Sequence, residues 1–140
     1  MEREIPEEYR AGVKNAITNW YYRLPEWEGM RELVCYFKER GYPVFVISNI
    51  SRGFAERASE IPILALTDGA IFSALCYATK PSAEIFDMAC RQFGYPKEEC
   101  VFIDDSQKNI DGAKAFGLNA IRFDGNADEL KKALCELLEQ

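Results

Sequence analysis

Five polar side chains in this 140-residue chain are of the types that phosphate chemistry uses, and most of them directly follow short apolar runs. They are a hydroxyl, an amide, an ammonium and two adjacent carboxylates: Ser48, Asn49, Lys80, Asp104 and Asp105. Carboxylates are hard oxygen ligands for Mg²⁺, which takes one or two of them together with water and phosphate. Ammonium and hydroxyl groups bind phosphoryl oxygens. The set predicts phosphoryl transfer, in which catalysis is mostly positioning and charge neutralisation.

Short apolar runs would bring most of these side chains to one place. Residues 44–47 (V-F-V-I) and 101–103 (V-F-I) are rich in β-branched residues, so we expect parallel strands that are buried on both faces. A third strand is expected at 120–123. Ligands of open parallel sheets bind beyond the carboxyl ends of the strands. We therefore expect three polar clusters, Ser48-Asn49, Lys80-Pro81 and Asp104-Asp105, to converge at or near that edge.

Helical spacing of apolar residues fills the stretches between the strands. Helices are expected at about residues 6–22, 27–40, 51–59, 82–94, 110–117 and 128–138. One of the segments 63–66 and 70–72 is expected to be a short strand. Strands that alternate with helices are typical of an α/β domain, in which helices cover both faces of a parallel sheet.

The composition argues against several classes of protein. A net charge of −6 does not suit a nucleic-acid-binding surface, which would need a basic stripe. No apolar run approaches the ~20 residues of a membrane span, and the acidic N-terminal segment is unlike a signal peptide. The chain has 5 cysteines, no C-x-x-C pair and no histidine, so a zinc site is not expected. Such thiols suit the core of a cytoplasmic protein.

Each candidate side chain also has a structural explanation when it is taken alone. Ser48 and Asn49 suit a turn or a helix cap, and Lys80 suits a solvated turn before a proline. Asp105 could cap the helix that follows it. Capping does not account for both Asp104 and Asp105, because adjacent acids repel each other unless a cation or donor lies nearby. The order and placement of the whole set therefore favour a functional interpretation.

Three segments resemble motifs of the haloacid dehalogenase (HAD) superfamily of phosphohydrolases, in the order that the family uses. They are V-F-V-I-S-N at 44–49, A-T-K-P-S-A-E-I-F at 78–86 and V-F-I-D-D-S-Q-K-N-I-D-G-A at 101–113. The similarity is greatest to the subgroup with a helical cap inserted after the first strand, and it covers about Trp27 to Phe123. It implies a Rossmann-like, three-layer α/β core with a parallel sheet.

The resemblance also implies a role for each matching residue. Ser48 would bind the transferring phosphoryl group, with Asn49 beside it, and Lys80 would hold both the phosphate and the nucleophile. Asp105 would ligate Mg²⁺, so that Lys80 and Asp105 are the catalytic candidates. Asp104 and Asn109 would support the metal, and the substrate would be a small phosphorylated metabolite.

The family's first motif, an apolar strand followed by D-x-D, has no counterpart in the sequence. Its first Asp is the nucleophile, and its second is the general acid and base. In the family this strand lies in the middle of the sheet, between the strands expected here at 44–47 and 101–103. We therefore expect a sheet that lacks its central strand. Unpaired backbone groups in a core are costly. Three outcomes are open: the two strands pair directly, another chain fills the gap, or the gap is not closed.

Two hypotheses about organisation and function follow from this pattern. Residues 1–24 are expected to be a remnant of the helical cap and residues 25–140 an incomplete core, as in a truncated chain. It would then be the C-terminal portion of a cytoplasmic, Mg²⁺-dependent phosphohydrolase that binds Mg²⁺ weakly and is inactive alone. The alternative is a non-catalytic pseudoenzyme or binding subunit that a partner chain completes.

A phosphorylation-dependent receiver domain is a weaker third interpretation. Such a domain also combines paired acids, a hydroxyl and a Lys-Pro pair on a parallel sheet. Its acids come first in the chain, however, and a separate phosphoacceptor Asp ends a middle strand. Here Asp104 and Asp105 come after the other candidates, and that separate Asp is missing.

Overall fold

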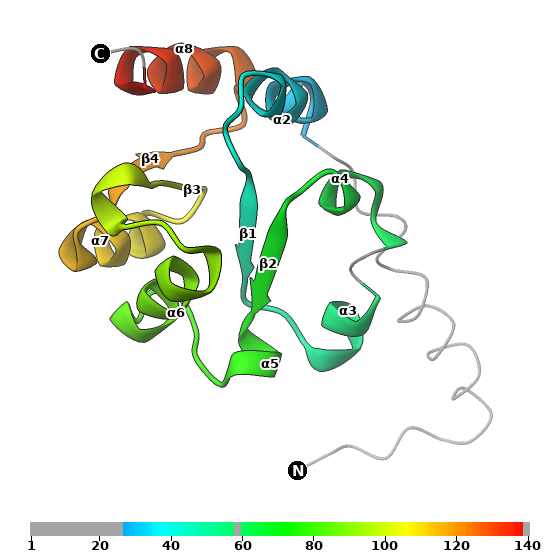
Figure 1. Cartoon of the computed structure of the whole chain (residues 1–140), viewed down its shortest axis with the longest axis vertical. Coiled ribbons are helices and arrows are strands. Elements are labelled where there is room, and N and C mark those ends of the chain that lie inside the picture. The colour runs from blue at the N-terminus through cyan, green and yellow to red at the C-terminus, as the bar shows by residue number, and fades with distance from the viewer. Residues whose placement is uncertain (1–26, 58–59, 139–140) are drawn as a thin grey trace.

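The computed structural model describes residues 27–57 and 60–138, and Figure 1 shows how their helices and strands are arranged. The strands are β1 (Phe45–Ser48), β2 (Gly69–Phe72), β3 (Val101–Asp104) and β4 (Asn119–Arg122). The longer helices are α2 (Met30–Glu39), α6 (Ala83–Phe93), α7 (Gln107–Phe116) and α8 (Ala127–Leu138). The shorter ones are α3 (Arg52–Glu56), α4 (Pro62–Ala65), α5 (Ser73–Cys76) and the 3₁₀ helix η3 (Lys97–Glu99).

The strands form two separate parallel pairs instead of one sheet. β1 pairs with β2, so that Ser48 lies opposite Phe72, and β3 pairs with β4, so that Asp104 lies opposite Arg122. Within the described residues no hydrogen-bonded ladder joins β1 to β3. The predicted parallel α/β core is confirmed, and among the described residues no strand lies between β1 and β3 and these two strands do not pair directly.

The prediction that the strands are buried on both faces is wrong. Every residue of β1 is only partly buried, and Ile103 of β3 is 37% exposed. Phe102 and Ile71, by contrast, are 9% and 4% exposed. A strand is covered on both faces only when neighbouring strands and helices continue the layer on either side. Among the residues that the structure describes, β1 and β3 each have one strand partner, so part of their apolar surface stays open.

Two apolar clusters place helices on opposite faces of the strands. The first joins α6 and α7 to the strands and centres on the fully buried side chains of Ile85, Phe86 and Ile110. It includes Ile47 of β1 as well as Phe102 of β3, so α6 and α7 cover both strand pairs. The second cluster packs α2 and α8 against the other face of β3 and β4. This arrangement, visible in Figure 1, confirms the predicted three layers.

Asp68 fixes the amino ends of β1 and β2 to each other. Its carboxylate accepts a hydrogen bond from the Val44 N–H at 2.7 Å, and its own N–H donates to the Val44 carbonyl at 2.7 Å. Lys38 of α2 forms an ion pair with the same carboxylate at 3.3 Å. The hydrogen bond from Val44 is the main cause of a lowered pKa at Asp68, which keeps this link ionised.

Local chemistry explains where the elements differ from the sequence-based expectation. The helix expected from residue 27 begins at Met30, because Gly29 precedes it with a φ of 79° that interrupts helical geometry. Of the two ambiguous segments, 69–72 is the strand, whereas Pro62 begins a short helix. The helix predicted at 6–22 and the proposed cap remnant at 1–24 lie outside the described residues.

We expect that Gly112→Ala will destabilise the protein by about 1–3 kcal/mol, the usual cost of overpacking. A methyl group at Gly112 would lie 2.5 Å from both the Cβ atom and the carbonyl oxygen of Pro81. Helix propensity alone predicts the opposite sign, a gain of about 1 kcal/mol. Urea unfolding measures the difference. The control, Lys108→Ala on the exposed side of α7, should shift stability by less than about 0.5 kcal/mol.

Candidate active site

A short ion pair forms the centre of the candidate site. The Lys80 ammonium lies 2.6 Å from Oδ2 of Asp104, and the two side chains are only 12% and 7% exposed. Asp104 is the last residue of β3, and Lys80 lies in the loop that leads into α6. Strand end and loop therefore meet at the carboxyl edge of the β3–β4 pair, where the sequence predicted a cluster of charge.

Donors surround the Asp104 carboxylate. Its Oδ1 accepts a hydrogen bond from the Ser106 N–H at 2.8 Å, and the Asn109 amide lies 3.3 Å from each oxygen. Burial alone would raise the pKa of Asp104. The hydrogen bond from Lys80, the Ser106 N–H, the charge of Lys80 and the Asn109 amide together outweigh burial and lower that pKa. Asp104 is therefore held ionised in this ion pair.

Asn49 connects β1 to the same site through the backbone of Lys80. Its amide nitrogen donates to the Lys80 carbonyl at 3.1 Å, and its amide oxygen accepts from the Lys80 N–H at 2.9 Å. Asn49 directly follows β1, whereas the Lys80 side chain reaches β3. These contacts bring the carboxyl ends of the two separate strand pairs together, although no ladder connects them.

The remaining candidates, Ser48 and Asp105, are next in the chain to Asn49 and Asp104 and take no part in the ion pair. Ser48 is the half-buried last residue of β1. The Asp105 side chain is exposed, and its carboxylate has no hydrogen bond or ion pair with the residues that the structure describes. Asp105 does not cap α7, because Ser106 is the N-cap and its hydroxyl accepts from the Asn109 N–H. A capping role therefore does not account for Asp105.

Arg122 is a further charged residue at this edge that the sequence did not single out. It ends β4 opposite Asp104, and its Nε donates to the Asp105 carbonyl at 3.2 Å. The guanidinium is exposed. The strand expected at 120–123 included Arg122 as an interior position, and only the one-residue shift of β4 to 119–122 makes it a strand end. If the expected strand had been placed one residue nearer the N-terminus, the sequence would have put Arg122 at the end of a strand and marked it as a candidate.

The comparison with known families completes this picture. The family described as haloacid dehalogenase-like hydrolase matches residues 4–117, which is most of the chain. This chain belongs to the HAD-like hydrolases. The three segments that resemble HAD motifs therefore carry the Lys80–Asp104 pair and the residues around it.

Two curated relatives of this HAD-like chain differ in their named activities. A Burkholderia cepacia (S)-2-haloacid dehalogenase 4A is 26% identical over 90% of this chain and 56% of its own length. A chloroplast flavin mononucleotide hydrolase 1 of Arabidopsis thaliana is 25% identical over 90% of this chain and 50% of its own length. The chain thus spans about half the length of these relatives.

Solved structures agree with the fold. A dehalogenase crystal structure superposes with a TM-score of 0.75 over 94% of this chain and 64% of that protein, at 23% identity. At this level of identity the likeness establishes the three-layer HAD fold and leaves the reaction to be argued from the site.

The residues of this HAD site fit a Mg²⁺ ion only in part. Both oxygens of Asp104 are already engaged, and the Lys80 ammonium lies where it competes with a cation. Asp105 offers a carboxylate that no described residue binds, and Mg²⁺ usually keeps several waters beside one or two carboxylates. Among residues 27–57 and 60–138 no group of three or more His, Cys, Asp or Glu side chains could hold a metal. Any ion here would depend largely on water and phosphate.

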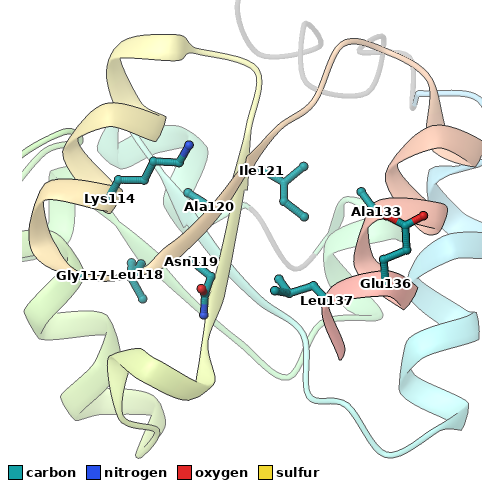
Figure 2. A pocket seen from close by; sticks show the side chains of 9 residues that line it. All are labelled: Lys114, Gly117, Leu118, Asn119, Ala120, Ile121, Ala133, Glu136 and Leu137. Carbon is teal, nitrogen blue, oxygen red and sulfur yellow. The ribbon is translucent and has the colours of Figure 1, made fainter. Parts of the chain in front are cut away.

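A surface groove among the described residues lies away from this site. Figure 2 shows a groove of about 610 Å³ between the end of α7, the edge of β4 and α8. Lys114, Asn119 and Glu136 supply its polar groups, and none of the candidate site residues lines it. No helix in the described part of the chain has the length and apolarity to cross a membrane.

We expect Lys80→Met to destabilise the protein by about 3 kcal/mol or more, because it leaves the buried Asp104 carboxylate without its cation. Adding Asp104→Asn should recover much of this loss, since the amide oxygen still accepts from Ser106. The matched control is Arg91→Met, which breaks the exposed Arg91–Asp87 pair and should cost less than about 1 kcal/mol. Denaturant unfolding of the variants compares them. Equal losses for Lys80→Met and Arg91→Met would contradict a structural role for the buried pair.

Proposed function

We propose that this chain carries the phosphate- and metal-binding part of a HAD-like phosphohydrolase that acts on a small phosphorylated metabolite. The observation that supports this most is the buried Lys80–Asp104 pair, held by Asn49 and Asn109 where the strand ends meet. An ammonium fixed in this way is suited to neutralise a phosphoryl group.

Chemistry favours a phosphate ester over a carbon–halogen bond as the bond that the site would act on. Sequence identity does not distinguish between the two reactions, because the dehalogenase and the mononucleotide hydrolase are almost equally similar to this chain. A phosphoryl group offers oxyanions that a divalent cation and Lys80 would bind together. A carbon–halogen bond offers no such oxygen. The adjacent acids Asp104 and Asp105 are therefore better explained by a phosphorylated substrate.

Each residue would then act by binding and orientation. Lys80 would neutralise phosphoryl oxygens, and the Ser48 hydroxyl would donate a hydrogen bond to them. Asp105 would hold Mg²⁺, while Asp104 keeps Lys80 in place and Asn109 orients Asp104. When bound, the ion would supply charge neutralisation at the transferring phosphate. The free thiols of all five cysteines would suit a reducing, cytoplasmic location.

The same proposal holds that this chain does not turn over substrate alone. The sequence contains no D-x-D segment, and Asp104 cannot easily replace the nucleophile because Lys80 and Asn109 occupy its oxygens. A carboxylate that accepts several hydrogen bonds is a weak nucleophile. Binding without turnover is the result that this arrangement favours.

Hydrolysis of p-nitrophenyl phosphate with and without Mg²⁺, together with Mg²⁺ titration by calorimetry, tests this proposal. We expect no turnover above buffer, and weak Mg²⁺ binding in the presence of inorganic phosphate. Asp105→Asn should abolish that binding because it removes the free carboxylate, whereas Asp128→Asn, at an exposed acid of α8, should retain it. Robust Mg²⁺-dependent turnover that is lost in Asp105→Asn would show that this chain does contain a nucleophile.

A second candidate function, a subunit completed by a partner chain, is favoured by the two separate strand pairs. β1 and β3 each have one edge without a strand partner among the described residues. Their carboxyl ends are joined through Asn49, Lys80 and Asp104, and one layer of helices packs on both pairs. Unpaired strand edges are templates for another strand. A partner would supply an extended apolar segment between them.

Amide hydrogen exchange distinguishes the free chain from one with a completed sheet. In the purified chain we expect fast exchange for those amides of β1 and β3 that do not bond to β2 or β4, because water reaches these edges. Amides that bond within each pair should be slower and provide the internal control. A monomer that unfolds cooperatively with both edges protected would contradict the need for a partner.

A further inference from the structure

The groove of Figure 2 opens over the outer edge of β4. Its lining comes from the end of α7, from residues 119–121 of β4 and from α8, and it includes no residue of β3. α7 packs on one face of the β3–β4 pair and α8 packs on the other. A groove that both helices line must therefore pass round an edge of β4, and β3 occupies the opposite edge. At the base of this β4 groove lies a strand edge with which no described strand pairs.

The two walls of the β4 groove carry opposite charges. Lys114 on α7 and Glu136 on α8 are exposed, and Figure 2 shows them on opposite sides of β4. Neither side chain has a hydrogen bond or an ion pair with the described residues. Between them, Ala120 packs toward the α7 side and Ile121 toward the α8 side. Each wall therefore combines apolar surface with one charge that no described residue neutralises.

An added β-strand matches the form of this groove. The unpaired N–H and C=O groups of a strand edge are a template for another strand, which would lie about 4.8 Å from β4. The groove volume of about 610 Å³ is within the range of sites that enclose ligands. Successive side chains of a strand point to opposite faces. Two side chains an odd number of positions apart would therefore face different walls, one toward α7 and one toward α8.

We infer that the β4 groove docks an extended peptide of another protein, which adds to β4 as a further strand. The peptide would carry an acidic side chain that meets Lys114 and, an odd number of positions away, a basic side chain that meets Glu136. Its apolar residues would cover Ala120 and Ile121. Opposite charges that face each other stabilise a pairing, whereas like charges destabilise it. The inference concerns the edge of β4 and does not depend on the proposed phosphohydrolase.

A second copy of this chain fits the same edge poorly. Two β4 edges that pair about a twofold axis in one continuous sheet place α7 beside its equivalent in the other copy, and α8 beside its own equivalent. Each Lys114 would then approach another Lys114, and each Glu136 another Glu136. These like charges oppose such pairing. A peptide of mixed charge is therefore the better occupant.

Fluorescence anisotropy with labelled peptides rich in Thr and Val tests the inference. One peptide carries a single Glu and a single Lys three positions apart. Its control has the same composition, with these two residues two positions apart. We expect the first to bind about fivefold more tightly, because the control must place both charges on one wall. High salt should reduce the difference. Equal affinity of the two peptides, or no binding by either, would overturn the inference.

Charge reversal at the walls shows whether the peptide binds in the β4 groove. Glu136→Lys makes both walls basic, so the preference should move to a peptide with two Glu residues three positions apart. Lys114→Glu should instead favour two Lys residues at that spacing. The control, Lys108→Glu, changes an exposed residue of α7 outside the groove and should leave the original preference unchanged. An original preference that survives both wall reversals would rule out this groove as the site.

Amide hydrogen exchange distinguishes strand addition from other occupants. The bound peptide should slow exchange of those β4 amides that do not bond to β3. A concentration-dependent dimer that protects these amides without peptide would make a second copy the occupant and overturn the inference. Protection of the same amides in a peptide-free monomer would also overturn it, because another segment of this chain would then cover the edge.

Discussion

The Lys80–Asp104 ion pair is the interaction on which the arrangement of this domain depends. The two strand pairs share no backbone ladder, so their relative position must come from side chains and covering helices. Asp104 ends one pair, and Lys80 is held through its backbone by Asn49, which follows a strand of the other. An isolated buried charge is costly, and each partner of this pair is nearly buried. The pair therefore stabilises the junction only while both charges and their hydrogen bonds are present.

The helices would not provide the same alignment without this junction. α6 and α7 contribute the apolar cluster that touches Ile47 and Phe102, and apolar contact is non-directional. Such contact holds the strand pairs under one helical layer but tolerates sliding between them. The hydrogen bonds of Asn49 and Lys80, each close to 3 Å, are directional and select one alignment. At the opposite end, Asp68 performs a similar task for β1 and β2 alone.

Sequence reasoning was most accurate where local chemistry decides the structure. Strand identity at 101–103 and the end of α6 at Gly94 follow from β-branched runs and a left-handed glycine, which act within a few residues. The clustering of Lys80 with Asp104 followed from the topology of parallel sheets. The exposure of Ile103 could not be derived in the same way, because it depends on which strands lie beside β3. Whether the gap beside β1 is closed is likewise a property of the assembled core.

The site also shows why one residue type can serve structure and chemistry together. An ammonium has three donor hydrogens, and Asp104 needs only one of them for the contact at 2.6 Å. The Phe102 ring lies 5.7 Å from the same ammonium and adds no competing acceptor of comparable strength. The remaining donors can serve a phosphoryl oxygen or a second carboxylate without breaking the structural pair. Both oxygens of Asp104, by contrast, already accept hydrogen bonds. The groups of the site that can still bind a ligand are therefore the Lys80 ammonium and the carboxylate of the exposed Asp105.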